Sequence, residues 1–275
     1  MRKAVLLLSL WATTLLFSVP PCYAAPLSIG VAPHTSARII LQMYQPLRQY
    51  LEKTLGREVD VVTAPDFNDF VRRGLTGTYD IAITTSHQAR LLQTDAGYIP
   101  LLTYQADFRS VALVAKSGPT KSAGDLKGKE VLGLSATSQV TLWGQRWLDE
   151  NGIDARMKYV SASDSVAQLV AAGEAAAGFT SLANYQKLPD PLRAQLMVLA
   201  QSPVMPGRVY LLSPRLAGQR RQIEAALWSF AATPEARKYF DENKLQGYRK
   251  LKAKELASMD AYAAEVRKVI KGKTP

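Results

Sequence analysis

Hydroxyl-bearing side chains gather at several points where an apolar, β-rich run gives way to a helical pattern. Such points lie at the carboxyl end of a strand, beside the free N–H groups that begin the next helix. These N–H groups and the positive end of the helix dipole favour an oxyanion, and a hydroxyl adds a donor without a counter-charge. The hydroxyl-bearing residues concerned are Thr84, Thr85 and Ser86, with His87 beside them; Ser135, Thr137 and Ser138; Ser163; Ser181; and Ser36.

This pattern predicts a site for a small anion where several of these corners converge. A tetrahedral oxyanion needs donors from several directions, which two facing halves of a protein can supply. Ser and Thr also cap helices without binding any ligand, so each corner alone has a purely structural alternative.

His87 and Arg109 are the other candidates for contact with an anion. His87 could donate to the anion or cap its helix, and Arg109 could face the cleft or pair with Asp107. His34 and His87 are the only histidines, which is too few for a histidine-rich metal site, so we predict no metal and no cofactor.

The sequence lacks the motifs of catalytic sites. It has no nucleophile elbow, no metal-binding histidine pair and no phosphate-cradling glycine loop ending in Lys-Ser or Lys-Thr. We therefore predict a protein that is not an enzyme.

The elements that would position these corners alternate between short strands and helices. The apolar patterns predict strands at 27–31, 58–63, 79–83, 130–134, 157–160 and 176–179, each followed by a helical segment. Such alternation predicts mostly parallel sheets with helices on both faces. Pro46 lies inside the first helical pattern, where we expect a kink or a break.

Two breaks in this alternation, near Arg109 and at 203–207, predict two lobes. Lobe one comprises 25–108 and 207–275, and lobe two comprises 109–206. The two connections between them would act as a hinge.

The first 24 residues predict a cleaved secretory signal. Arg2 and Lys3 precede an apolar run that ends at prolines, and cleavage is expected after Ala24. A membrane anchor is disfavoured because the run is shorter than the roughly 20 residues that span a bilayer. Lipid attachment at Cys22 is disfavoured because Pro21 occupies the position where a small residue is needed.

The formal net charge of +11 makes the chain basic. Its basic residues are scattered, which predicts a solvated surface and no nucleic-acid partner. A small anionic solute is compatible with this charge.

Several segments resemble periplasmic phosphate/phosphite/phosphonate-binding proteins of ABC transporters. They include Ile29-Gly-Val-Ala-Pro33, Tyr79-Asp-Ile-Ala82, Phe108-Arg-Ser-Val111, Asp125-Leu-Lys-Gly-Lys129 and Ser202-Pro-Val-Met-Pro-Gly207, and the resemblance runs from about 27 to 245. It implies a type II periplasmic-binding fold, in which two α/β lobes close on the ligand by a hinge.

The resemblance also implies that Ser135, Thr137 and Ser138 bind the oxygens of the ligand. Three positions depart from the pattern of the family's phosphonate binders. Ala89 stands where a tyrosine is expected, Ser163 replaces a histidine and Ser181 replaces an acidic residue. These departures disfavour an aminoalkylphosphonate and favour a smaller or different anion.

The predicted function is that of a periplasmic, monomeric solute-binding protein, which presents an anion to the membrane permease of an ABC transporter. The alternative is a periplasmic ligand sensor that docks on a membrane receptor, either a sensor kinase or a cyclase. An enzyme on the same two-lobed fold is the least favoured possibility.

Overall fold

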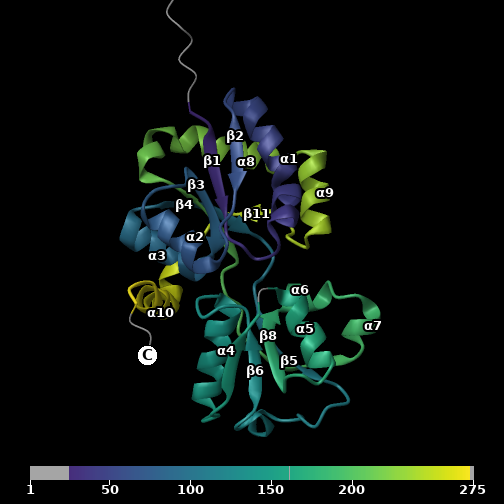
Figure 1. The fold of residues 1–275 in the computed structure, drawn as a ribbon. Helices are drawn as coiled ribbons and strands as arrows, with labels where there is room; N and C mark the ends of the chain where they lie inside the picture. Colours follow the sequence, from purple (N-terminus) through teal and green to yellow (C-terminus); the bar gives the residue numbers. More distant parts are fainter. Residues whose placement is uncertain (1–24, 161, 273–275) are drawn as a thin grey trace, which may run out of the picture.

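Two helix-flanked sheets, one above the other, form the body of the protein in the computed structural model, which describes residues 25–160 and 162–272 (Figure 1). The predicted signal segment 1–24, with Cys22, lies outside these residues. Within them, no helix has both the length and the apolar character needed to cross a bilayer. We refer to each sheet with its helices as a lobe.

Lobe one contains a six-stranded sheet in the order β11-β4-β10-β3-β1-β2. Its strands are β1 (Leu27–Val31), β2 (Val59–Val62), β3 (Ile81–Thr85), β4 (Ile99–Tyr104), β10 (Arg208–Leu212) and β11 (Tyr248–Arg249). One face packs on α1 (Ala37–Leu55), α8 (Arg220–Ala231) and α9 (Pro234–Glu242). The other packs on α2 (Phe67–Leu75), α3 (Ser86–Ala96), η3 (Glu255–Met259) and α10 (Asp260–Ile270).

Lobe two contains a five-stranded sheet in the order β7-β6-β8-β5-β9. Its strands are β5 (Ser110–Ala115), β6 (Glu130–Gly133), β7 (Arg156–Tyr159), β8 (Ala177–Ser181) and β9 (Leu196–Gln201). One face packs on α4 (Gln139–Glu150) and η1 (Ala123–Leu126), and the other on α5 (Ser163–Ala171), α6 (Leu182–Gln186) and α7 (Asp190–Arg193). The remaining short helix, η2 (Pro214–Gln219), precedes α8 in lobe one.

Both sheets are mixed, whereas the alternation of elements predicted mostly parallel ones. β1 runs parallel to β2 and β3, but β10 runs antiparallel to β3 and β4. In lobe two, β6 is parallel to β7 and β8, while β5 is antiparallel to β8 and β9. The reversal has a simple cause, because β5 and β10 are the strands by which the chain enters one lobe from the other.

Helix α1 is a single helix, although Pro46 lies inside it. It begins at the cap Ser36 and ends at Gly56, whose φ of 60° is left-handed. The proline removes the N–H that would bond to the carbonyl of Gln42, which is an exposed residue. Water can reach that residue, so the expected break is not needed.

The two lobes are joined by the segments 105–109 and 202–207, which pair with each other. The amide of Met205 donates to the carbonyl of Phe108 at 2.9 Å, and Arg109 Nη1 donates to the carbonyl of Ser202 at 3.4 Å.

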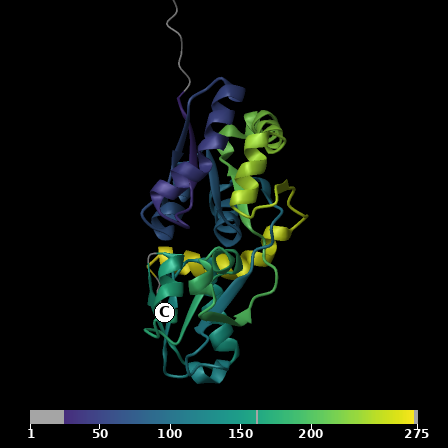
Figure 2. The same cartoon turned by 90° about the vertical axis from the view of Figure 1, so that its right-hand side faces the viewer.

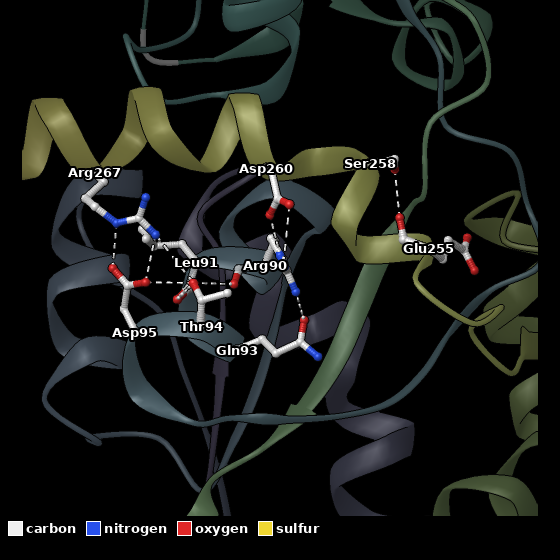
Figure 3. Close-up of polar contacts among 9 residues, drawn as sticks. All are labelled: Arg90, Leu91, Gln93, Thr94, Asp95, Glu255, Ser258, Asp260 and Arg267. Carbon is white, nitrogen blue, oxygen red and sulfur yellow. Dashed lines mark hydrogen bonds and ion pairs between the residues drawn. The ribbon is translucent and has the colours of Figure 1, made fainter.

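Helix α10 runs across the junction of the lobes (Figure 2). It is bonded to α3, where Arg267 Nε and Nη2 donate to the two carboxylate oxygens of Asp95 at 2.7 Å each and Arg90 pairs with Asp260 (Figure 3). Its Tyr262 ring also lies 5.1 Å from the Arg146 guanidinium of α4. The C-terminal helix therefore contacts both lobes, although the sequence division assigns it to lobe one.

Candidate functional site

A cavity of about 770 Å³ lies between the lobes and is lined by residues of both. This volume lies within the range of small-molecule sites. The connections between the lobes contribute Asp107, Phe108, Arg109 and Gly207 to its wall. Its hydroxyl-bearing residues come from strand ends and helix starts, and include Thr35, Thr85, Ser138, Ser163, Thr180 and Ser181.

Three predicted serines of lobe two line this cavity and also serve as local structural groups. Ser138 caps α4, where its Oγ accepts from the amide of Thr141 at 3.3 Å. Ser181 caps α6 by accepting from the amide of Asn184, and Ser163 Oγ accepts from the side-chain amide of Asn184 at 2.9 Å. Ser163 and Ser181 only accept in these contacts and can still donate to a ligand, whereas Ser138 Oγ donates its proton to Thr141 Oγ1 at 2.7 Å.

Thr85 and Thr180 have hydroxyls that are buried and make no hydrogen bond among the described residues. Thr85 ends β3 in lobe one and Thr180 lies in β8 of lobe two, and both line the cavity. A buried polar group without a partner is costly, so these two hydroxyls are candidates for contact with a ligand.

The other hydroxyl-bearing candidates do not line the cavity. Thr84 donates to Gln88 Oε1 at 2.6 Å, and Ser36 caps α1 by accepting from the amide of Ile39 at 3.4 Å. Ser135 has a buried hydroxyl without a partner among the described residues, but it is not part of the cavity wall.

Ser86, His87 and Thr137 join the lobes to each other instead of lining the cavity. His87 Nε2 lies 2.8 Å from the carbonyl of Thr137, and Ser86 Oγ donates to Gln139 Oε1 at 3.3 Å. Thr137 Oγ1 donates to Asn68 Oδ1 at 2.5 Å. The start of α4 is thereby tied to α2 and α3 of lobe one.

Burial lowers the pKa of His87 to about 4, although the carbonyl of Thr137 and the side chain of Gln139 act in the opposite direction. His87 is therefore neutral at ordinary pH, and its Nε2–H donates to the Thr137 carbonyl. It serves as an uncharged contact between the lobes.

Arg208 is a cavity residue that the sequence patterns did not single out. Its Nη1 donates to His34 Nε2 at 2.6 Å and to the hydroxyl of Tyr44 at 3.4 Å. Its guanidinium lies over the ring of Tyr104, 5.4 Å from the centroid. Arg208 directly follows Pro206-Gly207 and is the first residue of β10, whose other residues are buried. A charged residue at such a position needs a polar partner, and this is the signal by which the sequence could have identified it.

The histidine that holds Arg208 is neutral. His34 Nδ1 lies 2.9 Å from the carbonyl of Ala32, so this nitrogen carries the proton and Nε2 accepts from Arg208. Burial and the Arg208 charge keep the pKa of His34 well below its ordinary value. His34 thus orients the guanidinium without neutralising it.

The charged residues of the cavity wall are predominantly basic. Its cations are Arg109, Lys187, Arg208 and Lys244, and its acids are Asp107 and Asp164. None of the ion pairs between described residues involves any of these six. A cavity with this balance favours an anion.

The chain belongs to the family described as ABC transporter, phosphonate, periplasmic substrate-binding protein, whose model matches residues 29–256. The fold and the interlobe cavity are therefore those of a substrate-binding component of a transporter, and not of an enzyme. Membership of this family favours transport over the sensory alternative.

Solved structures of bacterial binding proteins share the fold. PhnD1 from Prochlorococcus marinus, in complex with methylphosphonate, has a TM-score of 0.78 at 15% identity, covering 88% of this chain and 98% of that one. XAC2383 from Xanthomonas citri, bound to chloride ion, has a TM-score of 0.76 at 18% identity, covering 91% and 100%. The aliphatic sulphonate binding protein SsuA from Escherichia coli has a TM-score of 0.58 at 19% identity, covering 91% and 84%.

These similarities confirm the predicted type II periplasmic-binding fold. Among the described residues, there is also no group of His, Cys, Asp and Glu side chains suited to hold a metal ion.

Proposed function

We propose that this protein captures a phosphonate-class oxyanion in the interlobe cavity and presents it to the membrane permease of an ABC transporter. The observation that carries the proposal is the convergence of unpaired donors on one cavity. Thr85 and Thr180 contribute unpaired hydroxyls from opposite lobes, and the cavity wall carries more cations than acids. The methylphosphonate, chloride and sulphonate named for the structural neighbours are all anions.

The predicted lobes, 25–108 with 207–275 and 109–206, would close on the ligand about the paired segments 105–109 and 202–207. An anion between the lobes attracts the cations of both, which favours the closed form. In this proposal Ser163 and Ser181 donate from lobe two, Ser138 holds the start of α4 at the cavity wall, and Arg109 contributes from the hinge.

The predicted signal segment would deliver the chain to the periplasm, where it acts as a monomer. Cleavage after Ala24 would leave a mature chain whose first residue is Ala25. N-terminal sequencing of secreted protein, with gel filtration coupled to light scattering, tests both expectations.

Calorimetric titration of the mature chain with methylphosphonate, phosphite, phosphate and sulfate tests the binding function. We expect at least one of these anions to bind, and Thr180→Val to weaken its affinity about tenfold because a buried ligand oxygen loses its donor. The exposed helical residue Thr54 provides a matched control, since Thr54→Val removes the same hydroxyl far from the cavity. Absence of binding to all the anions tested would refute the proposal.

A further inference from the structure

Arg208 carries a charge that its surroundings orient but do not balance. Its contacts are the neutral imidazole of His34, the hydroxyl of Tyr44 and the ring face of Tyr104. A guanidinium fixed by neutral groups at the wall of a cavity is prepared for a planar anionic partner, such as a carboxylate, which can accept two hydrogen bonds from it.

Two further cations, Lys187 and Lys244, line the same cavity as Arg208. The charges of Arg208 and Lys244, together with desolvation as the largest cause, lower the pKa of Lys187. Arg208 and Lys244 belong to lobe one, whereas Lys187 follows α6 in lobe two. We call these three residues the basic pole of the cavity. They repel one another until an anion is placed between them, so an acidic group bound here would also hold the lobes together.

The basic pole and the hydroxyl groups of lobe two are represented at opposite ends of helix α6. Ser181 and Lys187 cap opposite ends of α6, and six residues of helix span about 9 Å. A ligand with two acidic groups on a short carbon chain can span this distance and contact both ends of α6.

The space between these regions has apolar walls. Ile39, Met43, Phe108, Leu182 and Leu188 all line the cavity. Its volume of about 770 Å³ is that of about 25 water molecules, so methylphosphonate would fill only a small part of it. The wall suits a ligand with a carbon chain between two polar ends.

We infer that the ligand is a phosphonate carrying a second acidic group, such as a carboxylate, on a short carbon chain, and that Arg208 is the residue that selects for this group. This inference rests on the proposed function. The phosphonate meets the hydroxyl groups of lobe two, and the second acid meets the basic pole. A ligand with an amine at that end would place a cation against Arg208 and Lys187.

Three ligands of matched chain length test this assignment. They are 3-phosphonopropionate, propylphosphonate and 3-aminopropylphosphonate, whose ends are acidic, neutral and basic. The three affinities are measured by calorimetry at fixed pH and ionic strength. We expect the acidic ligand to bind at least about tenfold more tightly than the neutral ligand, and the amine to bind most weakly. The variant Arg208→Gln should abolish the preference for the acid while changing the affinity for propylphosphonate by less than about threefold.

Two further variants keep the test interpretable. Arg237→Gln removes one exposed arginine of α9 and should leave all three affinities unchanged. Lys187→Gln, at an exposed position, should reduce the preference for the acid even if Arg208→Gln fails to fold, which circular dichroism would reveal.

The possible outcomes separate the inference from the proposed function. If wild-type protein binds propylphosphonate as tightly as 3-phosphonopropionate, the second subsite is refuted and the proposed function stands. If Arg208→Gln weakens all three ligands equally, Arg208 belongs to the primary anion site and the inference is again refuted. If no phosphonate binds, the proposed function itself fails, and the inference with it.

Discussion

The buried contact of His87 with Thr137 should make the joined lobes sensitive to acid. His87 has a pKa of about 4 in the folded protein, against an ordinary value of 6.5, because burial disfavours the imidazolium. The unfolded chain therefore binds more protons than the folded chain between these two pKa values, and stability falls as the pH falls through this window.

The size of this loss follows from the two pKa values. At pH 5 the unfolded imidazole is almost fully protonated, while the folded one is only about one-tenth protonated, which corresponds to a loss of about 2 kcal/mol relative to pH 7. At pH 4 the loss reaches about 3 kcal/mol. Well above pH 6.5 this loss vanishes, because the imidazole is then neutral in both the folded and the unfolded chain.

The assay is urea unfolding at pH 7, 5 and 4 of wild-type protein and of His87→Gln. Glutamine is neutral throughout, so the variant should lack this part of the acid sensitivity and lose about 2 kcal/mol less than the wild type between pH 7 and 5. His34, whose pKa is also lowered, is present in both proteins, so its contribution cancels. Small-angle X-ray scattering of the same samples separates opening of the lobes from unfolding. Parallel losses in the two proteins would refute the account.

Three further predictions concern stability and are measured by urea unfolding at pH 7. Gly144→Ala should cost about 1–3 kcal/mol, because a Cβ there would lie 2.4 Å from Cγ of Phe179. Asp80→Ala should cost about 2–3 kcal/mol, because its buried carboxylate accepts from the amide of Ser28 and from Arg215 Nε at 2.9 Å each. Gln246→Gly should stabilise by about 1 kcal/mol, because Gln246 has a left-handed φ of 62° that glycine adopts without strain.

Matched substitutions check the first two of these expectations. Gly218→Ala meets no atom within 4 Å and should change stability by less than about 0.5 kcal/mol, so an equal cost at Gly144 would show that packing is not the cause. Asp241→Ala removes an exposed carboxylate from α9 and should also be nearly neutral. A loss of stability in Gln246→Gly would mean that its side chain contributes more than its backbone conformation costs.

The order of elements was predictable because hydrophobic periodicity is a local property. The strand-like runs at 27–31 and 130–134 correspond to β1 and β6, and the corner ending in Ser138 does begin a helix. The direction of the strands was not predictable from the same pattern. The breaks near Arg109 and at 203–207 mark where the chain crosses between the lobes, but not the direction in which β5 and β10 then run.

The roles of the hydroxyl-bearing corners were only partly accessible from the sequence. Ser138 and Thr137 are adjacent, yet Ser138 lines the cavity while Thr137 bonds to Asn68 in the other lobe. Which of two neighbours faces a ligand depends on the local backbone and on what lies opposite, and neither is encoded in residue type. The sequence therefore locates the corner but cannot assign its side chains.

Arg208 was missed because its significance depends on residues brought together from four separate segments. His34 follows β1, Tyr44 lies in α1, Tyr104 ends β4 and Arg208 begins β10. Each is unremarkable in the sequence, and only their convergence leaves a cation oriented but unbalanced. In a protein whose lobes meet through neutral contacts such as His87 with Thr137, that charge gives the cavity an electrostatic reason to stay open until an anion arrives. In the proposed function, binding of the acidic group and closure of the lobes are then coupled, because its arrival neutralises the charge of Arg208.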